Sequence, residues 1–359
     1  MNRSPFTARS PFVSGDMSWT TLIGNHRVKA TLRAALREDR LAHALIFSGP
    51  DGVGKRQFAL TLAKAVNCTE READSCDQCS ACRKIDEGAH MDVMLVEPEG
   101  TFIKIDQVRQ LIQEAYYRPF EGRQRVFILD PADALNESAA NALLKALEEP
   151  PATSLMILLT SRLHALLPTI RSRCQVHTFT PLTVKEIEGF LRERYRRPED
   201  QTRLLARLSG GRIGRALEID LSVYRTWRKE ALELLKLLAA GDDRARLIKA
   251  AEYLGRKLSR EEFEDRLSVV NILLRDLLYL AVEGDGADII NVDIASTLRR
   301  LAAVWPLERI AALSAHLETL RRNLQQNVHR QIALEDIFLL MVSGETCSST
   351  EAKKRLLRK

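Results

Sequence analysis

A glycine-rich loop between an apolar run and a helical pattern constrains the fold of this chain more than any other feature. Residues 49–55 are Gly-Pro-Asp-Gly-Val-Gly-Lys, and they stand between the apolar run 44–48 and a helical stretch over 57–65. Such glycines let backbone N–H groups turn toward phosphate oxygens, and the helix that follows presents its positive end. The sequence therefore predicts a phosphate-binding loop whose nucleotide contacts are Gly49, Gly52, Gly54 and Lys55.

Two positions depart from the pattern of a site that hydrolyses ATP. The residue after the loop lysine is usually Ser or Thr, whose hydroxyl holds Mg²⁺, and here it is Arg56. Asp130 ends another apolar run and is a candidate Mg²⁺ ligand, but Pro131 follows it where such ATPases carry the Glu that activates water. Asp133 is either a substitute for that Glu or, more simply, the N-cap of a helix over 134–148. These two departures predict that the site does not hydrolyse ATP, and they do not decide whether it still binds ATP.

Apolar runs and helical patterns alternate over the first half of the chain. The runs are apolar throughout, as buried strands of a parallel sheet require. Their succession with helices predicts an α/β core that has helices on both faces of the sheet. With 45% apolar and 28% charged residues, the composition is that of a globular protein. The predicted strands are 44–48, 93–97, 126–130 and 155–160.

Beyond Pro181 the strand signals stop and helical periodicity continues. The glycines Gly210 and Gly211 interrupt the first helical region, and apolar residues farther on repeat at spacings of three and four. We expect these stripes to form a bundle core, so that a subunit contact has to use what stays exposed. The predicted divisions are a flexible tail 1–20, the α/β core 21–181, a small helical lid 182–222, an all-helical domain 223–345 and a basic tail 346–359.

Four of the six cysteines crowd into an insertion at 68–82. Their spacing suits a tetrahedral Zn²⁺ held by four thiolates, which leaves no position for water and so indicates a structural site. Disulfides are the less favoured alternative, because a chain without a secretory signal is expected in a reducing cytoplasm. His90 lies near enough to be considered, but a fourth cysteine makes it unnecessary. The predicted zinc ligands are Cys68, Cys76, Cys79 and Cys82.

Several short motifs of the chain occur together in one known family. They are Leu-Ala-His-Ala at 41–44, Asn-Ala-Leu-Leu-Lys at 141–145, Leu-Glu-Glu-Pro-Pro at 147–151 and Ser-Arg-Cys at 172–174, with the cysteine cluster. With these motifs the chain resembles the clamp-loader ATPases of bacterial DNA polymerase III, which belong to the AAA+ class. The resemblance covers residues 22–220 and extends more loosely over the C-terminal helices. It implies an AAA+ core with a parallel sheet, a helical lid and an all-α collar domain that joins a pentamer.

The resemblance also implies roles for individual residues. In this family Ser-Arg-Cys presents an arginine to the nucleotide of the neighbouring subunit, so Arg173 is the candidate arginine finger in trans. Its alternative is a salt-bridged structural arginine. Thr160 falls where the family senses nucleotide from a strand end, although an ordinary strand-end Thr looks the same. Gly214 stands where the motor subunits carry a phosphate-sensing arginine, and Arg215 is one residue off that position.

Together these features predict a subunit that assists ATP hydrolysis without performing it. By resemblance, its partners are the motor (gamma/tau) and delta subunits of a heteropentamer, and through the complex the sliding clamp and primer-template DNA. Two alternatives stay open: an ATP-hydrolysing motor of the gamma/tau type, and a zinc-dependent DNA-binding protein. The formal charge of +6 is compatible with nucleic acid without requiring it. We expect a soluble, cytoplasmic protein with structural Zn²⁺, and ATP as a second ligand whose binding is undecided.

Overall fold

The computed structural model describes residues 18–241, 243–324 and 329–343. The described residues form two compact units, one ending at Leu217 and the other beginning at Glu218. The predicted basic tail, 346–359, lies outside the described residues, as does most of the predicted N-terminal tail. No helix within the described ranges is long and apolar enough to cross a membrane.

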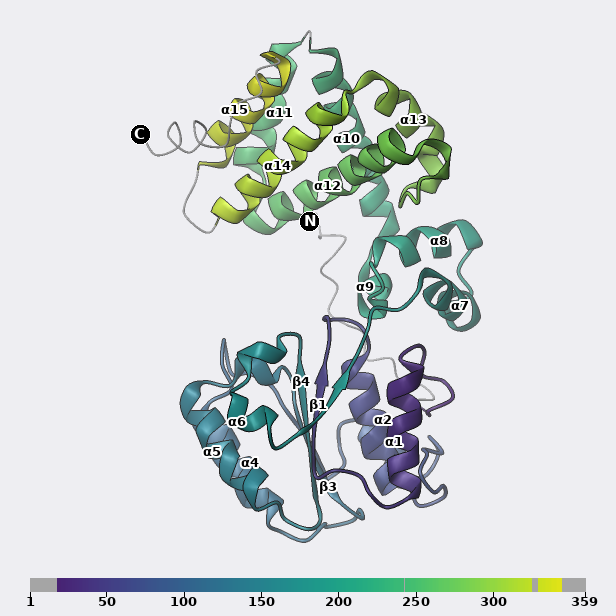
Figure 1. The fold of residues 1–359 in the computed structure, drawn as a ribbon, viewed down its shortest axis with the longest axis vertical. Helices are drawn as coiled ribbons and strands as arrows, with labels where there is room; N and C mark the ends of the chain where they lie inside the picture. Colours follow the sequence, from purple (N-terminus) through teal and green to yellow (C-terminus); the bar gives the residue numbers. More distant parts are fainter. Residues whose placement is uncertain (1–17, 242, 325–328, 344–359) are drawn as a thin grey trace. The chain divides into compact units, whose positions relative to one another are not determined.

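A parallel sheet of five strands forms the middle of the N-terminal unit (Figure 1). The strands lie in the order β2-β3-β4-β1-β5, and every pairing is parallel. The three central strands are buried along their whole length, which explains why their sequences are apolar without alternation. The strands are β1 (Ala44–Ser48), β2 (Val93–Val96), β3 (Arg125–Leu129), β4 (Ser154–Thr160) and β5 (Gln175–Thr178).

Helices cover both faces of this sheet, as the sequence predicts (Figure 1). Alternate residues of β1 enter the two layers because strand side chains point to opposite faces. Leu45 and Phe47 pack with residues of α1 and α2, whereas Ala44 and Ile46 pack with residues of α4, α5 and α6. The helices of the core are α1 (His26–Arg37), α2 (Lys55–Asn67), α3 (Ser80–Asp86), α4 (Ile105–Ala115), α5 (Glu137–Glu148) and α6 (Pro168–Arg171).

The structure differs from the sequence-based expectation at two elements. β5 is an additional strand at the sheet edge, and most of its residues are exposed, so no apolar run marks it. Helix α5 begins at Glu137 instead of 134, because the Asn136 side chain accepts the N–H of Ala139 at 2.8 Å and caps it. Asp133 is therefore not the cap of this helix.

Three short helices complete the N-terminal unit. They are α7 (Val184–Tyr195), α8 (Glu199–Leu208) and α9 (Ile213–Glu218). The turn before α9 depends on Gly211, whose φ of +80° suits glycine and where an added Cβ would lie 2.5 Å from the Cβ of Pro181. This close approach ties the start of α9 to the segment that leaves the sheet.

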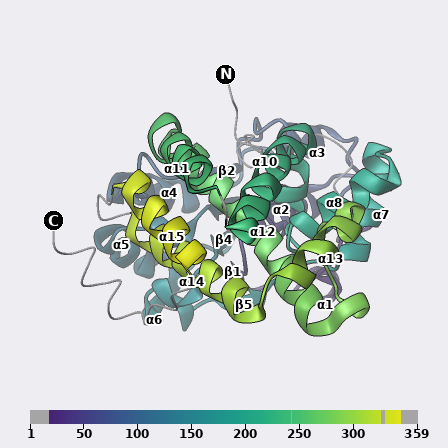
Figure 2. The same cartoon turned by 90° about the horizontal axis from the view of Figure 1, so that it is seen from above.

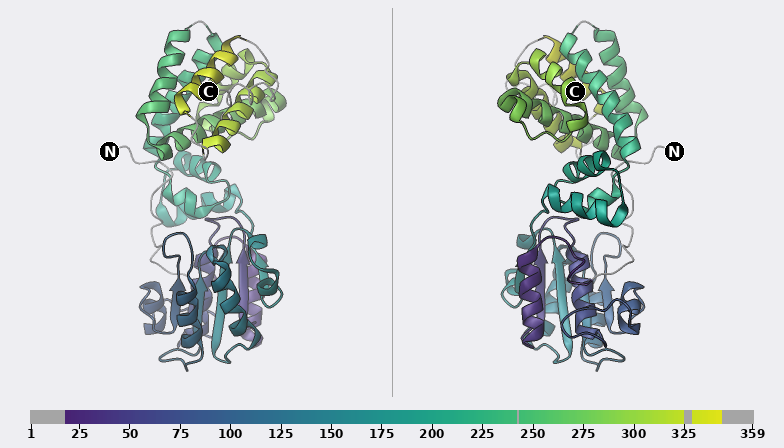
Figure 3. Two further views of the ribbon diagram at one scale, coloured as in Figure 1. Left: turned by 90° about the vertical axis from the view of Figure 1, so that its left-hand side faces the viewer. Right: turned by 90° about the vertical axis from the view of Figure 1, so that its right-hand side faces the viewer.

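The C-terminal unit is a bundle of helices (Figure 2). Helix α12 packs against α10, α13 and α14, and α15 packs against α11 and α14 (Figure 3). Both predicted apolar stripes are buried, so their residues form bundle core. The first stripe is Phe263, Leu267, Val270, Leu274 and Leu277, and the second is Ile310, Leu313, Leu317, Leu320 and Leu324. The helices are α10 (Leu221–Ala240), α11 (Arg244–Glu252), α12 (Arg260–Glu283), α13 (Ala295–Val304), α14 (Leu307–Asn323) and α15 (Arg330–Ser343).

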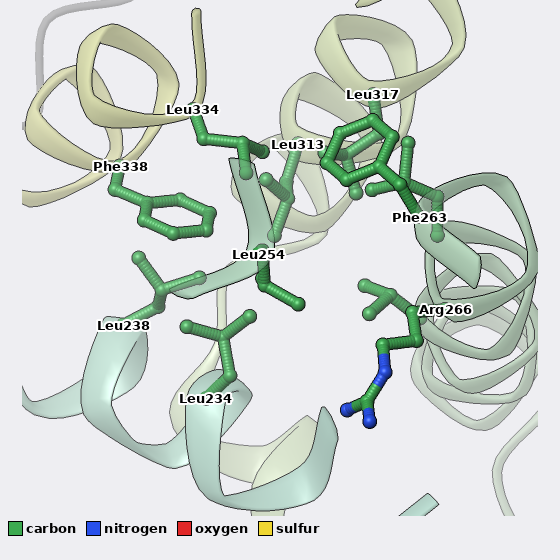
Figure 4. Close-up of a pocket in the computed structure, with 11 residues that line it drawn as sticks. Leu234, Leu238, Leu254, Phe263, Arg266, Leu313, Leu317, Leu334 and Phe338 are labelled. Carbon is green, nitrogen blue, oxygen red and sulfur yellow. The ribbon is translucent and has the colours of Figure 1, made fainter. Parts of the chain in front are cut away.

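A small cavity lies inside this bundle (Figure 4). Its volume is about 20 Å³, and leucine and phenylalanine side chains such as Leu234, Leu313 and Phe338 form most of its wall. Such a volume holds roughly a single water molecule, which would find no hydrogen-bond partners on an apolar wall. Arg266, the charged residue at its wall, directs its guanidinium to Glu230. The cavity is a packing gap and not a ligand site.

Candidate nucleotide site and metal centre

The glycine-rich loop connects β1 to α2 and can form only with its glycines. Gly52 and Gly54 have φ values of 78° and 98°, in the left-handed region that side chains disfavour. Gly49 is fixed by space instead, because an added Cβ would lie 2.4 Å from the carbonyl oxygen of Phe179. The loop thus has the strand-loop-helix setting of a phosphate-binding loop, with the N-terminus of α2 at its end.

Lys55 turns its ammonium group into the loop. Its Nζ donates to the carbonyl oxygens of Gly49 and Pro50 at 2.5 and 2.9 Å, and lies 3.5 Å from Oδ1 of Asp51. Burial lowers the pKa of Lys55, and the nearby Asp51 carboxylate opposes that shift. The ammonium is therefore held mainly by neutral carbonyls at the place where a phosphate would meet it.

Arg56 bridges two carboxylates at the ends of neighbouring strands. Its Nε lies 2.5 Å from Oδ2 of Asp130, which follows β3, and its Nη2 lies 2.5 Å from Oε1 of Glu97, which follows β2. Burial lowers the pKa of Arg56, but the two carboxylates outweigh that effect and raise it. The candidate Mg²⁺ ligand Asp130 thus already has a cation, supplied by the residue that replaces the usual Ser or Thr.

A hydrogen bond joins the side chains of Thr160 and Asp133. The Thr160 hydroxyl donates to Oδ1 of Asp133 at 2.8 Å, and Nε of Arg162 donates to the other carboxylate oxygen at 2.9 Å. Burial raises the pKa of Asp133, and these hydrogen bonds outweigh it and lower the pKa. A carboxylate held in this way is a poor proton acceptor, which argues against Asp133 as a substitute for the missing Glu.

Helix α9 touches the loop through two glycines. The N–H of Gly214 donates to the carbonyl oxygen of Gly52 at 2.9 Å. An added Cβ on Gly214 would lie 3.3 Å from the Cα of Gly52, tighter than ordinary contact. Gly214 therefore serves close backbone contact here, at the position where the motor subunits are expected to carry an arginine.

Arg173 lies at the surface, after the short helix α6. Its Nη2 is 2.7 Å from Oε1 of Glu148, and its Nη1 donates to the carbonyl oxygen of Thr169 at 3.0 Å. The side chains of the pair are 35% and 51% exposed, for Arg173 and Glu148 respectively. An ion pair this exposed stabilises a fold by about 1 kcal/mol at most. Stability alone is thus a weak reason for an arginine at this position.

The four clustered cysteines come together beside the end of α2. Their sulfur atoms all lie within 4.8 Å of one another. A tetrahedral zinc with bonds of about 2.3 Å separates its sulfur ligands by about 3.8 Å, so the cluster fits the ion. None of the described cysteines forms a disulfide. His90 is not in the cluster, and its Nδ1 instead accepts the N–H of Asp92 at 3.1 Å.

Backbone N–H groups point at the sulfur atoms of this cluster. The N–H of Cys79 donates to Sγ of Cys76 at 3.2 Å, and that of Cys82 donates to Sγ of Cys79 at 3.4 Å. Burial raises the pKa of Cys79, but hydrogen bonds from Cys82 and Thr69 outweigh it and lower the pKa to about 6. These contacts favour the thiolate of Cys79, the form that binds zinc, whereas burial and the hydrogen bond with Cys79 raise the pKa of the Cys82 thiol.

Lys64 joins the cysteine cluster to the helix that begins at the phosphate loop. It lies on α2 with a fully buried side chain, and its Nζ pairs with Asp77, between two of the cysteines, and with Asp86 of α3 at 2.8 Å. Burial lowers the pKa of Lys64, and the two carboxylates outweigh it and raise the pKa. The ammonium therefore stays charged and holds the insertion against α2.

Replacing Lys64 with methionine should destabilise the N-terminal unit strongly. The change keeps the length of the side chain but leaves the carboxylates of Asp77 and Asp86 without a counterion, which costs about 3–5 kcal/mol. Urea unfolding of the zinc-loaded chain measures the loss. Lys84→Met is the matched control, because Lys84 pairs with Glu121 at the surface, where about 1 kcal/mol or less is at stake. Equal losses in both variants would contradict the account.

Comparison with known proteins places the chain in a family. The family model described as DNA polymerase III, delta subunit, matches residues 24–183, and that described as DNA polymerase III, delta subunit, C terminal, matches 226–342. The delta prime subunit of DNA polymerase III from Bacillus subtilis is 30% identical over 319 residues, or 89% of this chain and 96% of that protein. The chain belongs to the clamp-loader subunits of DNA polymerase III.

Other relatives of this clamp-loader subunit carry three different subunit names, delta prime, tau and gamma. The delta prime subunit from Pseudomonas aeruginosa is 36% identical over 55% of this chain and 61% of that protein. The tau subunit from Bacillus subtilis is 29% identical over 88% of this chain and 59% of that protein. A solved gamma subunit-related protein from Thermotoga maritima is 21% identical over 88% of this chain, with a TM-score of 0.38.

The predicted nucleotide-binding residues of this clamp-loader subunit lie together at the carboxyl ends of the parallel strands. Gly49, Asp130 and Thr160 follow or end the neighbouring strands β1, β3 and β4. Sequence reasoning missed Glu97, the second carboxylate on Arg56. Glu97 directly follows β2, and β2 runs parallel to β3, so Glu97 and Asp130 both lie at the carboxyl ends of the strands. This position in the sequence could have identified Glu97 as part of the site.

Proposed function

We propose that the chain is the delta prime subunit of a bacterial DNA polymerase III clamp loader and assists ATP hydrolysis without performing it. The observation that carries this proposal is the ion pair between Arg56 and Asp130. It puts a fixed cation on the carboxylate that a hydrolysing site uses for Mg²⁺. Pro131 stands where such ATPases carry the Glu that activates water, and the two carboxylates nearby are engaged, Asp133 by Thr160 and Arg162 and Glu97 by Arg56.

Arg173 is the residue through which the chain acts in this proposal. An arginine that reaches the triphosphate of a neighbouring motor subunit offsets the charge that develops on the phosphoryl group in the transition state. The surface position of Arg173 supports the role, because its guanidinium is already partly exposed and is held by Glu148, the Thr169 carbonyl and, at 3.4 Å, the Ser172 hydroxyl. On docking, phosphate oxygens would replace that carboxylate as the acceptors of a planar, bidentate donor.

The same proposal gives the other predicted sites their roles. The four cysteines hold a structural Zn²⁺ that fixes the insertion on α2. The glycine loop and Lys55 keep the shape of a nucleotide site without turnover. The C-terminal bundle serves as a collar that joins motor and delta subunits, through which the chain acts on the sliding clamp and primer-template DNA.

Reconstitution tests this proposal against the motor alternative, which the similarity to tau favours. Purified gamma or tau, delta and this chain should form one complex on size exclusion, with DNA-stimulated clamp loading that is lost when the chain is omitted. A chain that stays out of the complex, or that replaces the motor subunits in loading, would contradict the proposal.

A further inference from the structure

The position of Arg56 places a permanent cation where a nucleotide site of this type takes a divalent one. Arg56 stands directly after the loop lysine, in the first turn of α2. Two of its three guanidinium nitrogens donate hydrogen bonds, one to Asp130 and one to Glu97. In a hydrolysing site the corresponding hydroxyl and the strand-end carboxylate both hold the metal. Here the hydroxyl is absent, because Arg56 replaces it, and the carboxylate of Asp130 is already paired with Arg56.

Charge around this position also disfavours a divalent ion. A metal that approached Asp130 would stand next to the guanidinium, and like charges at contact distance repel strongly away from bulk water. Arg56 is 31% exposed and Asp130 is 19% exposed, so solvent screens the pair only in part. The residues present therefore do not fit Mg²⁺.

The cation at this position nevertheless suits phosphate. Lys55 and Arg56 are consecutive: Lys55 donates from its Nζ to a loop carbonyl, and Arg56 pairs with Asp130, a carboxylate near enough to raise the pKa of Lys55 as well. A guanidinium binds phosphate oxygens without needing the fixed octahedral shell of Mg²⁺. The loop glycines and the start of α2 supply backbone N–H groups, as in other phosphate-binding loops.

We propose that Arg56 replaces Mg²⁺ in this site, so that the loop binds a nucleoside triphosphate free of divalent metal. The inference rests on the proposed non-hydrolysing function, and it specifies the ligand of the site as a nucleoside triphosphate without bound Mg²⁺. It makes the loop a metal-independent nucleotide site instead of a vestige of a magnesium site.

Calorimetric titration of the full, zinc-loaded chain with ATP tests the inference. Magnesium is removed on a resin instead of with a chelator, so that zinc is retained, and the titration is repeated with excess MgCl₂. We expect ATP to bind at least as tightly without Mg²⁺ as with it. Binding that Mg²⁺ tightens by about tenfold or more would overturn the inference, as would no binding under either condition.

Two substitutions assign the effect to Arg56. Arg56→Thr restores the hydroxyl and frees Asp130, so Mg²⁺ should tighten its ATP binding by about tenfold. Arg56→Lys keeps a cation after Lys55 but loses the fork that joins Asp130 and Glu97, so its ATP affinity should fall while its binding stays independent of Mg²⁺. This readout remains available if the threonine variant fails to fold. A threonine variant that folds but gains no magnesium dependence, or a lysine variant that gains it, would contradict the inference. If Mg²⁺ tightens ATP binding by about tenfold or more and no turnover follows, only this inference fails, whereas turnover defeats the proposed function itself.

Discussion

Changing Arg173 to alanine should abolish most ATP hydrolysis at the motor site that receives it, while the chain itself stays folded. Loss of an arginine finger lowers turnover by about a thousandfold or more in other phosphoryl-transfer systems. The fold should tolerate the change, because the pair with Glu148 is exposed and stabilises by about 1 kcal/mol or less. DNA-stimulated turnover of the reconstituted loader measures the effect, with the remaining motor sites setting the residual rate.

Two variants separate the finger from an ordinary surface arginine. Arg173→Lys keeps the charge but loses the planar fork, so it should also lower turnover. Arg203→Ala removes another exposed arginine, paired with Glu199 at 3.0 Å on α8, and should leave turnover unchanged. Unchanged turnover by a loader that contains Arg173→Ala would refute the finger role.

Loss of the metal should destabilise the N-terminal unit and leave the C-terminal bundle intact. Cys68→Ser removes a fully buried member of the proposed zinc site, so the insertion loses the metal and is held to α2 mainly by the Lys64 ion pairs. Structural zinc contributes directly to folding free energy, and we expect a loss of about 3–5 kcal/mol, equivalent to a fall in melting temperature of about 6–20 °C. Calorimetric melting shows the shift, and elemental analysis shows whether zinc is bound in equimolar amount.

Cys174 provides the matched control for this experiment. It is a free cysteine outside the cluster, so Cys174→Ser should retain zinc and melt near the temperature of the unchanged chain. Equimolar zinc in Cys68→Ser, or an unchanged chain that carries no zinc and does not respond to a chelator, would remove the metal from the account.

Local sequence patterns predicted those parts of the structure that depend on local chemistry. The loop glycines, the apolar central strands and the cysteine spacing each express a requirement within a short segment. The structure confirms the sheet core and the position of the loop between a strand and a helix. The edge strand β5 was missed because its exposed residues carry no apolar run. The start of α5 was misplaced because Asn136, and not Asp133, supplies the cap.

Contacts between distant segments could not be predicted in the same way. Arg56 was identified only as the loss of a metal ligand, and its pairing with Glu97 depends on how β2 and β3 align. The burial of Lys64 among carboxylates of the insertion likewise depends on how that insertion folds back onto α2. A single charged residue in sequence does not reveal whether its partner is solvent or another side chain.

The most direct test of the central claim is ATP turnover by the isolated, zinc-loaded chain, with the Lys55→Ala variant measured beside it. The account predicts no turnover above background for either protein, with or without Mg²⁺ and primed DNA, because Arg56 occupies Asp130 and Pro131 replaces the water-activating Glu. Turnover that disappears on changing Lys55 would contradict the account and identify the chain as a motor subunit.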